Sequence, residues 1–194
     1  AIDFVLKQQL IDTPGTKFNY NGGCTQLLAA ILEKASGMKM DVFTEKYLFK
    51  PLGIKPYSWV KIKDGNASAA SGLRMRSIDL AKFGLLYLNG GRWKGKQLIP
   101  EHLVLQTMNS QIATPFFDSS YYTGYSNQFW IQTELINGKK LSYAQCQGNG
   151  GQLIIIDKHF DLVLVITAGN YDKNTIGKSS WDIYLDFIYK ALTK

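Results

Sequence analysis

Extended apolar runs alternate with short turns in the second half of the sequence, and this pattern constrains the fold most. The runs are rich in β-branched and aromatic residues, and glycine, asparagine or aspartate marks the turns between them. The four runs are Tyr125–Thr133, Lys140–Gln147, Gln152–Asp157 and Leu162–Thr167. Connections this short join antiparallel neighbours, because a parallel pair needs a long crossover. The pattern therefore predicts an antiparallel meander, and an amphipathic helix over Trp181–Leu192 is expected to pack on it.

The first half carries helical periodicity instead. Leu27, Leu28, Ile31, Leu32 and Ala35 share one face of a helix that Gly37 should end. A second helix is expected from Asp41, as N-cap, to Leu48, a third after Ser77, also as N-cap, and a short one from Pro100 at its first position. Helices followed by strands indicate an α+β fold rather than alternating βαβ units. The 194 residues are interpreted as one part of a single domain, mainly helical over 1–115, with the antiparallel sheet and C-terminal helix over 116–194.

Composition excludes several classes of function. Two cysteines, Cys24 and Cys146, and two histidines are too few for a disulfide scaffold or most metal centres. The sequence leaves open whether the cysteines pair, and buried free thiols are the expected state. We predict no metal and no cofactor.

The excess of Lys+Arg, 22 against 15 Asp+Glu, gives a formal net charge of +7. The basic residues are scattered in ones and twos, which favours a solvated surface over a nucleic-acid site. No apolar run reaches the length of a membrane-spanning helix, and no signal peptide opens the chain.

Familiar catalytic patterns are missing from the sequence. No Gly-x-Ser-x-Gly motif, Walker motif or dinucleotide-binding glycine pattern is present, and neither histidine lies beside a plausible nucleophile loop. Tyrosine, lysine and backbone amides are therefore the groups left for acid–base work and for stabilising an oxyanion.

Three stretches, taken together, resemble the serine β-lactamase and penicillin-binding-protein family, in the group of class C β-lactamases, D-alanyl-D-alanine carboxypeptidases and esterases. Their order and spacing agree with the family over nearly the whole chain. They are Pro14–Leu28, Ser71–Gly91, and Gly148–Gln152 with the closing segments Leu162–Ile166 and Ala168–Tyr171. The resemblance implies the β-lactamase/transpeptidase-like fold and a reaction through a covalent acyl-serine.

The resemblance also implies roles for individual residues. Tyr20 takes the place of the tyrosine that shares proton transfers with the catalytic lysine. The backbone N–H of Gln152 would be one oxyanion donor. The neighbouring positions expected to contact substrate are Asn21, Gly22, Asn149, Gly150 and Gly151.

Two departures from the family pattern bear on substrate. Gly22 stands where Asn is usual, so a polar contact is lost or shifted to Asn21. Asn149 stands where Lys or His is usual, which weakens recognition of a carboxylate. These changes favour an esterase or amidase over a true β-lactamase. They also keep an alternative open, a non-catalytic homologue that binds peptide or cell-wall material in the same cleft.

The family nucleophile, a Ser-x-x-Lys pair at a helix N-terminus, is not found in a suitable place. Ser36–Lys39 and Ser58–Lys61 match the pattern, but the first should lie at a helix C-terminus and the second in extended chain. The expectation is that the nucleophile helix and N-terminal strands are missing here, so that the chain alone is inactive. An exposed sheet edge should then pair with that missing portion or with another copy. The resemblance favours a bacterial periplasmic or secreted protein.

Overall fold

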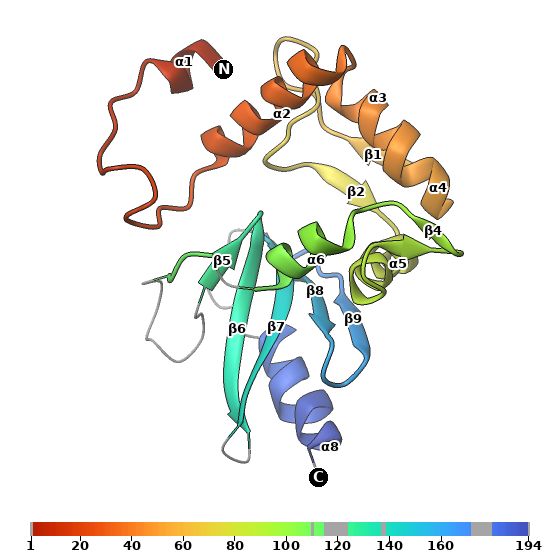
Figure 1. The fold of residues 1–194 in the computed structure, drawn as a ribbon. Helices are drawn as coiled ribbons and strands as arrows, with labels where there is room; N and C mark the ends of the chain where they lie inside the picture. Colours follow the sequence, from red (N-terminus) through yellow and green to blue (C-terminus); the bar gives the residue numbers. More distant parts are fainter. Residues whose placement is uncertain (1, 110, 115–123, 137–138, 172–179, 194) are drawn as a thin grey trace. The chain divides into compact units, whose positions relative to one another are not determined.

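The chain folds into two compact units, residues 1–79 and 80–194, and each unit has a hydrophobic core of its own (Figure 1). The computed structural model describes residues 2–109, 111–114, 124–136, 139–171 and 180–193.

Helices dominate the first unit. Its elements are α1 (Ile2–Leu6), α2 (Gly22–Ser36), α3 (Met40–Thr44), η1 (Glu45–Phe49), α4 (Lys50–Leu52), β1 (Tyr57–Trp59) and β2 (Leu73–Met75). Helix α2 ends as predicted, because Gly37 takes the left-handed conformation at φ 69°. The buried side of α2 packs through Ala29 against Met40 and Ala67. Two residues of the predicted inward face, Leu28 and Ile31, are 52% and 63% exposed.

The second helix is longer than predicted and begins earlier. Segments α3, η1 and α4 run on without a break from Met40 to Leu52, and Lys39, rather than Asp41, occupies the N-cap. Asp41 lies in the first turn, where its carboxylate accepts a hydrogen bond from Lys61. The Asp41 side chain, which was predicted to cap the helix, is therefore paired with Lys61, 20 residues away in sequence.

The second unit is built around one antiparallel sheet. Its first elements are α5 (Ser77–Leu88), β3 (Arg92–Trp93), β4 (Lys96–Gln97) and α6 (Glu101–Met108). Ser77 is the first helical residue of α5 and not its predicted N-cap. Pro100 is the N-cap of α6 and not its first helical residue. The sheet has the order β5-β6-β7-β8-β9, with β5 (Gly124–Ser126), β6 (Phe129–Ile136), β7 (Lys139–Gly148), β8 (Gln152–Asp157) and β9 (Leu162–Ile166). The predicted meander is confirmed.

One strand boundary differs from the prediction. The run Tyr125–Thr133 is divided between β5 and β6 by a turn at Asn127 and Gln128, whose φ angles are 44° and 71°. Neither residue is glycine, so the sequence carried no strong signal for a reversal here.

Each face of the sheet is covered by helices. Ile154 and Ile156 of β8 pack in one core with Val104 and Met108 of α6, and Leu80 and Phe83 of α5 border this core. The alternate residues Leu153 and Ile155 pack with Trp181 and Tyr184 of the last helix. The described part of that helix covers residues 180–192 and contains η2 (Ile183–Tyr189) and α8 (Lys190–Leu192), drawn in blue in Figure 1. The predicted packing of the last helix on the sheet is confirmed.

Helix α5 approaches the sheet closely at a glycine. A Cβ atom built on Gly84 would lie 2.5 Å from Cγ1 of Val163 in β9 and 3.4 Å from Cγ2 of Ile154. Only a residue without a side chain fits between the helix and this strand.

Candidate active site

Tyr20, Asn21 and Gly22 form the entry to helix α2 in the first unit. The Tyr20 side chain is 55% exposed. Asn21 is the N-cap of α2, with extended backbone angles, and its Oδ1 accepts a hydrogen bond of 2.7 Å from the N–H of Gly23. Tyr20 therefore precedes the N-terminal end of a 15-residue helix, where backbone N–H groups favour negative charge.

Close packing favours glycine at position 22, which the sequence did not reveal. A Cβ at this position would lie 3.2 Å from Cβ of Ala70. The segment that contains Ala70 is tied to α2 by a hydrogen bond of 2.9 Å from the Ala69 N–H to Oε1 of Gln26. A larger residue at position 22 would push against this segment.

The two Ser-x-x-Lys matches lie where the sequence placed them. Ser36 is the last residue of α2, and its Oγ accepts a hydrogen bond of 3.2 Å from the Met38 N–H. Lys39 directs Nζ to Asn66 Oδ1 at 2.6 Å. Ser58 lies on strand β1, and Lys61 pairs with Asp41. Neither serine begins a helix, so neither has the geometry of the family nucleophile.

Residues Asn149, Gly150 and Gly151 form the turn between β7 and β8 in the second unit. Gly148 and Gln152 face each other across the two strands. The N–H groups of Gly150 and Gly151 lie 2.9 and 3.3 Å from the carbonyl oxygen of Gly148, and Gly151 has φ 85°. A turn this tight, with a left-handed residue, requires glycine at position 151.

Three hydrogen bonds hold this turn from outside. The Gln152 side chain donates through Nε2 to the Ala168 carbonyl oxygen, and the Asn170 N–H donates to the Gly150 carbonyl oxygen at 3.2 Å. The buried hydroxyl of Ser180 donates to the Gly151 carbonyl oxygen at 2.8 Å. Tyr171 also lies close, because a Cβ on Gly150 would be 3.0 Å from its ring.

The structure thus groups the predicted site residues into two local sets, one at the start of α2 and one at the β7–β8 turn. Sequence reasoning missed Ser180, which is 29 residues away from Gly151 and belongs to no recognisable motif. It also missed the contact that Tyr171 makes with the turn.

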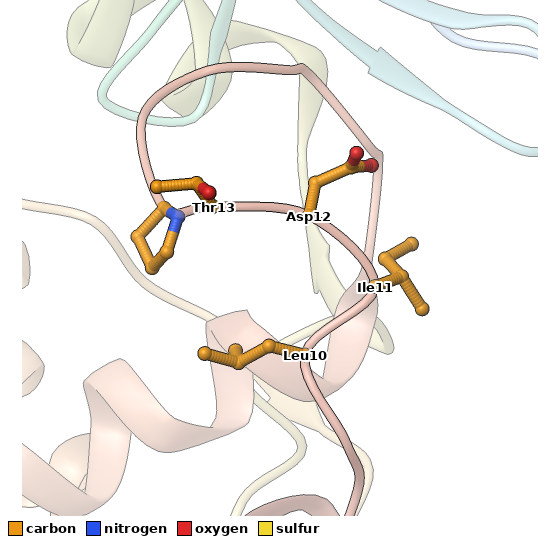
Figure 2. A pocket seen from close by; sticks show the side chains of 5 residues that line it. Leu10, Ile11, Asp12 and Thr13 are labelled. Carbon is orange, nitrogen blue, oxygen red and sulfur yellow. The ribbon is translucent and has the colours of Figure 1, made fainter.

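A shallow pocket elsewhere in the first unit is lined by few groups that could act as an acid, a base or a nucleophile. Figure 2 shows Leu10, Ile11, Asp12 and Thr13 along the loop between α1 and α2, with Leu10 and Ile11 pointing to opposite sides. Its one carboxylate, Asp12, forms an ion pair of 2.7 Å with Lys17.

Two further findings concern the described part of the chain. It holds no group of three His, Cys, Asp or Glu side chains arranged to bind a metal ion. No helix within it has the length and apolar character needed to cross a membrane. Both cysteines are free thiols, but Cys24 is exposed, so the prediction that both are buried was wrong for Cys24. Burial raises the pKa of Cys146 to about 12.

Comparison with known proteins identifies relatives of this fold. A family model described as Beta-lactamase matches residues 1–178. A Bacillus anthracis protein designated a 6-aminohexanoate-dimer hydrolase superposes with a TM-score of 0.81 and 25% identity, over 97% of this chain and 48% of that one. No curated protein sequence matches the chain.

Two other solved structures share the fold. The D-amino acid amidase from Ochrobactrum anthropi SV3, in complex with D-phenylalanine, has a TM-score of 0.67 and 15% identity over 97% of this chain and 63% of that chain. The octameric penicillin-binding protein homologue from Pyrococcus abyssi has a TM-score of 0.65 and 20% identity over 93% of this chain and 47% of that chain.

The present chain therefore spans about half the length of the Bacillus and Pyrococcus proteins. The family match covers most of the sequence, and the Bacillus anthracis structure superposes on 97% of the chain. The chain belongs to the beta-lactamase family.

Proposed function

We propose that this chain is part of a serine hydrolase that cleaves an amide or ester bond through an acyl-serine intermediate. The observation that carries the proposal is the turn at Gly148–Gln152, whose glycines and external hydrogen bonds form a fixed backbone edge next to the sheet. The family match and the hydrolase designation of the Bacillus anthracis neighbour support it. In this proposal the 194 residues are one part of a larger domain.

The proposed reaction assigns a role to each local set. A serine hydroxyl from the remainder of the domain attacks the substrate carbonyl carbon, and its proton passes to the lysine–Tyr20 pair. The developing oxyanion accepts a hydrogen bond from the Gln152 N–H. Tyr20 and its partner lysine then protonate the leaving amine or alcohol. Attack by water on the acyl-serine releases the acid and restores the hydroxyl.

We expect the site to bind a substrate without a carboxylate group. Asn149 offers a neutral amide where relatives of this type carry a cation, so it can form hydrogen bonds but cannot form an ion pair. Gly150 and Gly151 are both buried, and the Gln152 side chain and the Tyr171 ring fill the space beside Gly150. Asn21 presents an exposed side chain beside Tyr20, although its Oδ1 is already used in the helix cap. An uncharged ester or amide fits this set of groups best.

A second candidate function is binding without catalysis. The close contact of Gly22 with Ala70 leaves little room for the asparagine that is usual in catalytic relatives, and this observation favours a homologue that holds peptide or wall material in the same cleft. Assembly with other copies is also proposed, and the octameric relative is a precedent for such assembly within the fold.

The experiment uses the full-length parent protein and p-nitrophenyl butyrate. We expect a burst of nitrophenol followed by turnover, and a butyryl adduct on one serine by intact-mass and peptide mass spectrometry. Tyr20→Phe should lower kcat by roughly 10²- to 10⁴-fold, since it removes the proton-transfer group. Tyr47→Phe is the matched control, because Tyr47 is similarly exposed, at 47%, on a different helix. A parent that forms no adduct would support the binding function instead.

A further inference from the structure

Ser180 acts on the same peptide unit that carries the proposed oxyanion donor. The Gly151 carbonyl and the Gln152 N–H belong to one planar peptide group, and in a trans peptide they point in opposite directions. Ser180 Oγ donates to that carbonyl oxygen at 2.8 Å, and the serine is only 5% exposed. Fixing the carbonyl end of the peptide therefore fixes the direction of its N–H.

The turn needs such an anchor because two of its residues are glycines. Gly150 and Gly151 restrict the backbone weakly, and Gly151 already adopts φ 85°. The other external bonds act on different groups, namely the Gly150 carbonyl and the Gln152 side chain. Ser180 is the first described residue of the last helix, and Trp181 and Tyr184 of that helix are buried against the sheet. The hydroxyl is thus held by a well-packed element.

We propose that Ser180 is a positioning residue for the hydrolytic reaction, because its hydroxyl fixes the peptide plane that directs the Gln152 N–H toward the substrate carbonyl oxygen. This inference rests on the proposed function. The same hydrogen bond withdraws electron density from the carbonyl and so makes the N–H a stronger donor. Ser180 itself does not touch the reacting atoms.

The kinetic test compares Ser180→Ala with the wild-type parent protein on p-nitrophenyl butyrate. Removing an oxyanion donor outright costs about 10²- to 10³-fold in kcat, so misdirecting it should cost less, about 10-fold. KM should change by less than about twofold, because the N–H acts mainly in the transition state. Ser180→Thr keeps the hydroxyl and should restore most of kcat. Ser142→Ala is the control, since it removes an exposed hydroxyl that pairs with Thr133.

Two spectroscopic measurements separate positioning from a general structural role. The infrared carbonyl band of the ¹³C-labelled butyryl-enzyme should move to higher frequency in Ser180→Ala, because the carbonyl loses hydrogen bonding. Labelling with carbonyl-¹³C glycine and ¹⁵N glutamine selects the Gly151–Gln152 peptide, the only Gly-Gln pair in this sequence. Its resonances should shift in Ser180→Ala and remain in place in Ser142→Ala.

The outcomes distinguish the two proposals. An active wild type in which Ser180→Ala leaves kcat, the carbonyl band and the labelled resonances unchanged would overturn the role of Ser180 alone. Shifted resonances with unchanged kcat and carbonyl band would also overturn it, because the bond would then be structural. A wild-type protein that forms no acyl-enzyme would overturn the proposed function, and the role of Ser180 with it.

Discussion

Gly150 lies where one added methyl group would meet two neighbours. A Cβ there would be 2.6 Å from Nε2 of Gln152 and 3.0 Å from the ring of Tyr171. We expect Gly150→Ala to displace the Gln152 side chain from the Ala168 carbonyl and to destabilise the chain by about 1–3 kcal/mol, the usual cost of overpacking. Urea denaturation of the 194-residue chain measures this change.

Gly169→Ala provides the matched control for this substitution. Nothing lies within 4 Å of a Cβ at position 169, and its φ is not in the left-handed region. The control should leave the free energy of unfolding unchanged or raise it by about 0.4–1 kcal/mol through the unfolded state. Equal destabilisation by both substitutions would contradict the close packing described at Gly150.

Residues of the candidate site differ in how far the sequence could reveal them. Tyr20 and the Gly148–Gln152 segment were recognisable because they belong to short motifs with a characteristic order. Ser180 belongs to no motif, and Tyr171 lies in a recognised segment whose contact with the turn the motif did not indicate, so only the folded chain places the two beside the turn. Gly22 departs from the family pattern, but its closeness to Ala70 arises only in the folded chain.

At the scale of elements, the ion pair between Asp41 and Lys61 joins helix α3 to the segment after β1. Hydrogen bonding to Lys61 holds the pKa of Asp41 below its ordinary value of 3.8. A lowered pKa means that the folded state binds this proton more weakly than the unfolded state. The stabilisation is therefore present above pH 3.8 and is lost as the pH falls through the lower, folded-state value.

We expect Asp41→Asn to cost about 0.5–1 kcal/mol at pH 7, since Lys61 is half exposed and solvent screens the pair. The cost should shrink as the pH falls below 3.8. Urea denaturation at a series of pH values measures it. Asp64→Asn is the control, because an asparagine can still accept the hydrogen bond that Asp64 Oδ1 receives from the Asn66 N–H. A pH-independent cost for Asp41→Asn would contradict the ion-pair explanation.

The end of α2 was predicted correctly at Gly37, whereas the second helix continues past the predicted Leu48 to Leu52. Gly37 and Gly53 both adopt the left-handed conformation that ends a helix, a property of glycine itself. The N-cap predicted at Asp41 lies two residues earlier, at Lys39, and the helix predicted to start at Pro100 starts one residue later, because a cap depends on which group the side chain finally contacts. The β5–β6 turn was missed because Asn127 and Gln128 adopt positive φ angles although neither is glycine.

At the scale of the whole molecule, the edge strand β9 favours association between copies of the chain. Among the described strands, β9 pairs only with β8, and its five residues are all leucine, valine or isoleucine. A strand edge without charge or proline readily pairs with another strand. We expect the 194-residue chain to form dimers or larger species in sedimentation velocity, with slower amide exchange in β9 as concentration rises. A monomer at every concentration would contradict this expectation.

The overall architecture followed from the sequence more reliably than any boundary. The continuous apolar run of β8 and the helical periodicity of the last helix each indicated buried residues, and the structure packs Leu153 and Ile155 of β8 with that helix in one core. The division into units at residues 79 and 80 had no such signal, because it falls inside helix α5, where the apolar pattern is continuous.

The narrow space between Gly84 and Val163 has an evolutionary consequence. Because a Cβ at position 84 would collide with Val163 of β9, positions 84 and 163 are not free to vary independently. Descendants of this sequence could acquire alanine at position 84 only together with a smaller residue at position 163, or with a shift of the helix that its other core contacts oppose. The two sites should therefore covary among homologues, and either substitution alone should be rare.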